Sequence, residues 1–294
     1  MTDQIIYDRG YRSYEGPRLG PPGARRAILK DGVRRVLGLG RKARMKIFPW
    51  LLISIGLAVA AGLIGAHWLI GDLAESVGDG LVPSYGEMFD IYGWIALLFI
   101  ALAGPQLLIP DRSRGVLSVY FSRPLTVDGY LTSKAGAFVA VVGVIYLLPQ
   151  FLLHLGLALI SDDGFLPYLG DNLDILWKVP ATALGFIVLH GALVFAISAF
   201  VDRQGIAAAT FLGLFIATRP IAFLMTEASF PGSNYFTLLA LDHHPRIIRD
   251  YLFNNTTEYP AEAAGFEVWV SLLVIIALVG LSTWLVRSRY RRLA

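Results

Sequence analysis

The chain has 294 residues, of which 55% are hydrophobic and only 16% are charged, and its formal net charge is +3 at pH 7. Soluble domains carry about 25% charged residues, and here the apolar residues form long blocks, which excludes an ordinary soluble globular protein. The composition instead indicates an all-α integral membrane protein. The absence of cysteine from the sequence excludes disulfides and thiolate metal sites.

Residues 1–46 form a polar arm that contains 12 of the 25 Lys and Arg residues. From Ala24 to Lys46, apolar residues recur at helical spacing between basic ones, at Leu29, Val33, Val36 and Leu37. The pattern predicts a basic amphipathic helix on the inner leaflet that contacts anionic lipids, weakened by Gly32, Gly38 and Gly40. A stop-transfer charge cluster is the alternative. No nucleic-acid partner is expected, because these basic residues already satisfy the rule that orients membrane proteins.

Six apolar segments in residues 47–294 are each expected to form a membrane-spanning helix, since about 20 residues cross a bilayer. They are Ile47–Ile70, Ile91–Ile109, Ala135–Ile160, Leu176–Val201, Gly205–Thr218 and Phe266–Val286. The fifth segment is short, because Pro220 is expected to end the helix. The piece Ile221–Met225 would then be re-entrant or interfacial.

Basic residues predict the orientation of these spans, because they concentrate on the cytoplasmic side. All but four of the Lys and Arg residues fall in the arm, in residues 110–134, at Arg203 or in the tail 287–294. The four on the other side are Lys178, Arg219, Arg246 and Arg249. All six tryptophans lie near predicted span ends, as expected at a membrane boundary. Both termini and the 110–134 segment are therefore predicted to be cytoplasmic, in a multi-pass protein of the cell inner (plasma) membrane.

The segment between the second and third spans is longer than a simple connection needs. Asp111 to Phe121 is expected to form a short helix that Pro124 ends. One face of that helix would carry Val116, Leu117, Tyr120 and Phe121. Thr126 and Asp128 can cap the helix that becomes the third span. An exposed apolar face of this kind favours docking to a partner.

The sequence from Gly104 to Lys134 resembles the segment after the second span in type-two export permeases of the ATP-binding-cassette (ABC) superfamily. The matching residues are Asp111, Arg112, Arg114, Gly115, Ser122, Arg123, Pro124, Tyr130, Leu131 and Lys134. The resemblance implies that residues 110–126 form a coupling helix, which inserts into a soluble nucleotide-binding ATPase subunit. The residues of that helix that would couple to the ATPase are Asp111, Arg112, Arg114, Gly115, Val116, Leu117, Tyr120, Phe121, Arg123 and Pro124. It also implies that a second permease, either another copy of this chain or a close relative, completes the pathway, and that the long outer loop, residues 226–265, caps the exit side.

The sequence contains no Gly-x-x-x-x-Gly-Lys-Ser/Thr phosphate loop. ATP and Mg²⁺ are therefore expected on a partner chain, with no cofactor and no catalytic site in this one. The resulting hypothesis is the permease subunit of an ATP-driven exporter whose apolar spans suit an amphipathic or lipid-like substrate. The alternatives are a membrane-embedded enzyme, for which His243 and His244 would be the first candidates, and a membrane scaffold subunit.

Pro105 and Arg219 are the candidate pathway or gate residues of the spans. Pro105 is expected to kink the second span. Arg219 lies about 21 Å along the fifth span and could snorkel outward, cap a broken helix or contact substrate. His67, His154 and His190 are best explained by hydrogen bonds to neighbouring helices. No Asp or Glu is expected deep in a span, which argues against a proton-driven transporter.

Overall fold

The computed structural model describes residue 16 and residues 19–77, 83–122, 125–228, 230–254 and 259–293. Within these ranges the chain is helical and has no strand. The helices are α1 (Gly20–Val36), α2 (Arg44–Val77), α3 (Met88–Ser113), α4 (Leu117–Phe121), α5 (Val127–Ile160), α6 (Phe165–Asp171), α7 (Ile175–Phe200), α8 (Gln204–Glu227), η1 (Ser233–Leu239), α9 (His243–Phe253), α10 (Pro260–Ala263) and α11 (Val268–Arg291). The predicted all-α class is confirmed.

Six of these helices are long and apolar enough to span a membrane, and each contains most of one predicted segment. They are α2, α3, α5, α7, α8 and α11. The centre of the bundle is formed by α3, α5 and α7, whereas only a minority of the residues of α2, α8 and α11 are buried. Leu159, Leu224 and Ile276 are examples of large apolar side chains that face outward. Such surfaces are stable in lipid, so the arrangement is that of a multi-pass membrane protein.

The predicted end of the fifth span at Pro220 is wrong. Helix α8 continues through Pro220 to Glu227, so Ile221–Met225 is its last part rather than a separate piece. Proline removes a single helical hydrogen bond, here the one to the carbonyl of Ile216. An apolar chain in lipid cannot replace its remaining backbone bonds with water, which makes continuing the helix the better solution. The same holds for α3, which continues through Pro105 and Pro110.

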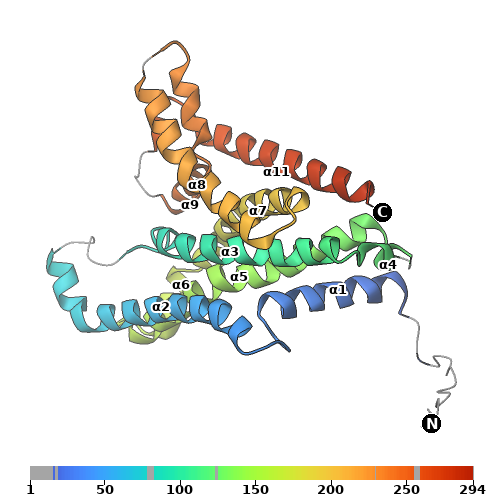
Figure 1. The fold of residues 1–294 in the computed structure, drawn as a ribbon. Coiled ribbons are helices and arrows are strands. Elements are labelled where there is room, and N and C mark those ends of the chain that lie inside the picture. Colours follow the sequence, from blue (N-terminus) through green and yellow to red (C-terminus); the bar gives the residue numbers. More distant parts are fainter. Residues whose placement is uncertain are drawn as a thin grey trace, which may run out of the picture.

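The basic arm forms α1, which ends at Val36 rather than at Lys46. Gly38 and Gly40 follow it with φ of +68° and +76°, a backbone conformation that glycine adopts readily, and α2 then begins at Arg44. Figure 1 shows α1 beside α5 and in line with α2. Gly32 does not merely weaken this helix: a Cβ there would lie 2.7 Å from the Cβ of Ala137, so glycine permits the close packing of α1 on α5. The inner-leaflet position of α1 stays a prediction.

The segment between α8 and α11 is largely folded. Helix α9 is the longest helix of this segment, and it packs against α7 and α11. In α9, Ile247 is buried, whereas Tyr251 is 70% exposed. Arg249 and Asp250 are also buried, and they pair with each other.

Candidate functional site

The segment predicted to couple to an ATPase lies at one end of the bundle, the end that holds the C-terminus (Figure 1). It is not one helix over Asp111–Phe121. Helix α3 runs to Ser113, residues 114–116 form a turn in which Gly115 has φ of +66°, and α4 follows. Thr126 caps α5 as predicted, because its Oγ1 accepts a hydrogen bond from the backbone N–H of Gly129 at 3.1 Å. Arg123 and Pro124 lie outside the described residues.

Asp111 is 3% exposed and binds side chains from two other helices. Its Oδ1 lies 2.7 Å from Nη1 of Arg35 in α1, and its Oδ2 lies 2.7 Å from Nζ of Lys134 in α5. The hydroxyl of Tyr130 donates to the same Oδ2 at 3.0 Å. Burial acts to lower the pKa of Arg35, but Asp111 and Asp31 outweigh it and raise that pKa above its ordinary value. The carboxylate therefore joins α1, α3 and α5.

Asp111 is buried, but it does not lie deep in a span, so it leaves the expectation of no carboxylate there unchanged. Asp111 is in the last turn of α3, beyond the predicted end of the second span at Ile109. Lys134 is the residue before the predicted start of the third span and is fully buried. The two charges lie just outside the apolar blocks, and pairing makes their burial tolerable.

Arg112 caps the end of another helix. Its guanidinium donates to the carbonyl oxygens of Ser198, at 3.0 Å, and of Ala199 and Val201, and it lies 2.9 Å from Oδ1 of Asp202. The last carbonyls of a helix lack intrahelical partners and carry partial negative charge, so a cation there is favourable. Arg112 thus ties α3 to the end of α7.

The apolar face of α4 packs inward rather than outward. Leu117 is 4% exposed, and the rings of Tyr120 and Phe121 each lie 6.0 Å from the ring of Tyr130. The Tyr130 ring in turn stacks on Tyr290 of α11 at 5.8 Å. The exposure that the sequence predicted for Leu117 is therefore wrong in this chain, because this face of α4 packs on the chain's own core, where Tyr130 of α5 takes the place expected of a partner. Val116 is half-buried.

The surface that α4 and its preceding turn leave open is small and mixed in character. Arg114, Gly115, Ser118 and Val119 are exposed, and Val119 is 55% exposed. We refer to these four residues as the α4 tip. Any partner that docks at this end without unfolding α4 would meet the α4 tip rather than the apolar face of the helix.

A second charged group, which sequence reasoning did not assemble, lies near the other end of α3. Asp90 is 2.6 Å from Nη1 of Arg246 and 2.8 Å from Nη1 of Arg249. Asp242 is 3.5 Å from Nε of Arg219 and 3.9 Å from Nε of Arg246. Three of the four basic residues on the predicted outer side thus converge, and the i, i+4 spacing of Asp242 and Arg246 was the available signal.

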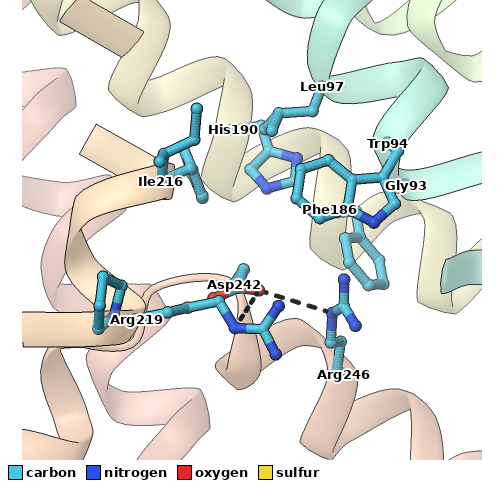
Figure 2. Close-up of a pocket in the computed structure, with 11 residues that line it drawn as sticks. Gly93, Trp94, Leu97, Phe186, His190, Ile216, Arg219, Asp242 and Arg246 are labelled. Carbon is cyan, nitrogen blue, oxygen red and sulfur yellow. Dashed lines mark ion pairs between the residues drawn. The ribbon is translucent and has the colours of Figure 1, made fainter. Parts of the chain in front are cut away.

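These residues border a pocket of about 250 Å³. Figure 2 shows Arg219, Asp242 and Arg246 on one side and His190 and Phe186 on the other. Trp94 of α3 and Ile216 of α8 complete much of its apolar wall. Since α8 is unbroken, Arg219 does not cap a broken helix. It borders the pocket with its side chain 44% exposed, while Pro105 is buried in α3 and is not among the lining residues.

Of the two outer-loop histidines, His244 has hydrogen-bond partners, whereas neither ring nitrogen of His243 has one among the described residues. His244 is fully buried, with Nδ1 3.0 Å from Oγ of Ser271 and Nε2 2.9 Å from the carbonyl oxygen of Leu238. Burial lowers the pKa of His243 and of His244. Among the described residues, no group of three or more His, Cys, Asp or Glu side chains could hold a metal ion.

Among the histidines of the spans, Nδ1 of His154 lies 3.1 Å from the hydroxyl of Tyr85. Nδ1 of His67 lies 3.1 Å from the carbonyl of Leu63 in its own helix, so the bond to a neighbouring helix predicted for His67 is wrong in the part of the chain that the structure describes. For His190, which was expected to bond a neighbouring helix, the prediction is wrong within the described residues. Neither of its ring nitrogens has a hydrogen-bond partner there, although the side chain is 3% exposed.

No protein-family model matches the chain, and a search of curated proteins also found no match. The resemblance of Gly104–Lys134 to ABC export permeases therefore rests on its residues alone.

Proposed function

We propose that the chain is the membrane-spanning permease subunit of an ATP-driven ABC exporter. It would move an amphipathic or lipid-like substrate out of the cytoplasm, across the plasma membrane, with both termini on the cytoplasmic side. Soluble ATPase subunits would bind ATP and Mg²⁺, and a second permease copy would complete the pathway. This chain would supply no catalytic group, only the binding surfaces and the moving helices.

The observation that carries the proposal is how the end of α3 is connected. Through Asp111 it contacts α1 and α5, and through Arg112 it contacts α7. The aromatic residues of α4 pack on Tyr130, which stacks on α11. A displacement of the α4 tip would therefore move several helices together through buried contacts, as a rigid-body transition between two packed states requires. A loop with no mechanical role needs no such connections.

The pocket at the other end of the bundle fits this scheme. Gly93, which borders the pocket, and Asp111 are 18 residues apart in α3, or about 27 Å along the helix axis. ATP bound to a partner at the α4 tip would thus act on a substrate site at a distance, through the continuous helix α3. Coupling of this kind needs the partner to bind the two conformations with different affinity.

The test is to place a charge on the α4 tip. Val119→Glu should leave the folded chain intact, because Val119 is exposed, but should abolish stimulation of ATP hydrolysis in the purified complex. The matched control is Leu293→Glu, which adds the same charge at an exposed apolar position after α11. Equal ATP hydrolysis in the two variants and in the wild type would refute the proposed coupling surface.

A further inference from the structure

The pocket beneath the outer loop has a polar end and an apolar end. The polar end is made by Arg219 of α8 with Asp242 and Arg246 at the start of α9, and by His190 of α7 opposite them (Figure 2). The apolar end is made by Trp94, Leu97, Phe186, Phe215 and Ile216. A site built in this way suits a molecule that is itself amphipathic.

The charge at the polar end is not evenly balanced. Arg246 has a close partner in Asp90 at 2.6 Å, and Arg249 has close partners in Asp90 and Asp250 at 2.8 and 2.7 Å. Among the described residues, the ion-pair partner of Arg219 is Asp242, at 3.5 Å from its Nε, and Asp242 is shared with Arg246. The side chain of Arg219 is 44% exposed, so its guanidinium can also bind an anion in the bidentate manner of such groups.

His190 provides an independent indication that the pocket binds a polar group. His190 is only 3% exposed, yet both of its ring nitrogens lack a hydrogen-bond partner among the described residues. The neighbouring rings of Phe186, Phe211 and Phe215 have no lone pair to accept its N–H. A buried polar group without a partner is costly and rare in native structures. A ligand head group lying between His190 and Arg219 would satisfy it.

We infer that this pocket binds an anionic amphiphile, with its carboxylate or phosphate head between Arg219 and His190 and its apolar chain against Trp94 and Phe215. Arg219 is about 22 Å from the start of α8, so the head group would lie in the predicted outer half of a core about 30 Å thick. Describing this ligand as the transported substrate rests on the proposed function, whereas its binding does not.

The test uses Trp94 as a reporter in the full chain purified in a neutral detergent. Dibromostearate quenches tryptophan on contact, and its methyl ester has the same chain without the charge. The acid should quench Trp94 saturably and bind at least tenfold more tightly than the ester. Trp94→Phe should remove the saturable part of the signal, which identifies the pocket among the six tryptophans.

Three variants separate the two ends of the site. Arg219→Gln should weaken binding of the acid about tenfold and leave the ester unchanged, whereas the control Arg203→Gln, at the opposite end of α8, should alter neither. Gly93→Phe should weaken both, since a Cβ at Gly93 would meet no atom within 4 Å and a larger side chain can enter the pocket without disturbing α3. Equal affinity for acid and ester, or acid binding unaffected by Arg219→Gln, would overturn the inference.

A brominated phosphatidylglycerol distinguishes two sources of the same chemistry. Tighter binding than the acid, with the same dependence on Arg219, identifies a two-chain membrane lipid, and weaker binding identifies a single-chain amphiphile. Because no ATPase is present in this assay, failure of binding would leave the proposed coupling at the α4 tip untouched. Conversely, if Val119→Glu did not change ATP hydrolysis in the purified complex, the proposed coupling would fail, but binding of the amphiphile in this assay would still stand.

Discussion

The buried carboxylate of Asp111 gives the sharpest prediction about stability. In Asp111→Asn, Arg35 keeps its second partner, Asp31, at 2.7 Å, but Lys134 loses its carboxylate while its side chain is only 1% exposed. An uncompensated buried charge costs about 3–5 kcal/mol. We therefore expect Asp111→Asn to lower the free energy of unfolding by about that amount. Equilibrium unfolding in mixed micelles with increasing SDS, followed by circular dichroism, measures it.

Two further variants decide whether the reasoning is right. Asp202 also pairs with an arginine, Arg112, but its side chain is 82% exposed, so Asp202→Asn should cost no more than about 1 kcal/mol. Adding Lys134→Met to Asp111→Asn removes the stranded charge and should recover most of the loss. The reasoning fails if Asp111→Asn and Asp202→Asn cost the same, or if Lys134→Met brings no recovery.

Three other predictions concern packing, pH and coupling. Gly32→Val should lower the free energy of unfolding by about 1–3 kcal/mol, because even a Cβ at this position clashes with Ala137. The control is Gly40→Val, where an added Cβ would meet no atom within 4 Å, so this variant should cost only the strain of its backbone conformation. Since burial lowers the pKa of His243, the folded chain binds fewer protons than the unfolded chain below pH 6.5, the ordinary pKa of histidine. The free energy of unfolding should therefore be unaffected by His243 above pH 6.5 and should fall by up to about 1.4 kcal/mol per pH unit below it. Equilibrium unfolding between pH 7 and 5 measures this slope, which should be smaller in His243→Gln; an unchanged slope would refute the assignment. Val119→Pro, which breaks α4, should leave the chain inserted and folded but separate ATP hydrolysis from transport in reconstituted vesicles, and normal transport would contradict the role of α4.

The spans and their order could be predicted because they depend on long apolar blocks, which the chain can stabilise only as helices in lipid. The helix boundaries were less predictable. Pro220 was expected to end α8, since a proline interior to a soluble helix is strongly destabilising, but in the apolar surroundings of a span the helix continues past it. Gly38 and Gly40, by contrast, end α1 as their backbone freedom suggests.

The side of α4 that faces the protein could not be predicted from its periodicity. The pattern of Leu117, Tyr120 and Phe121 shows that this face seeks apolar contact, but it does not say whether a partner or the chain itself supplies that contact. Tyr130 supplies it here and is itself held against Tyr290 of α11, 160 residues further along the chain. Long-range pairs such as Tyr130 with Tyr290, Asp111 with Arg35 and Asp90 with Arg246 carry no local signal in a single sequence.

The most direct test of the central claim is photo-crosslinking from the α4 tip in native membranes. A benzophenone amino acid replacing Val119 should crosslink to a soluble polypeptide that contains a phosphate loop and hydrolyses ATP, and the yield should change when ATP is added. The same probe replacing Trp68, which is 72% exposed near the opposite end of the bundle, should give no such product. If position 119 crosslinks to no second polypeptide in a complex that still transports, the account of this chain as an ATP-driven permease is contradicted.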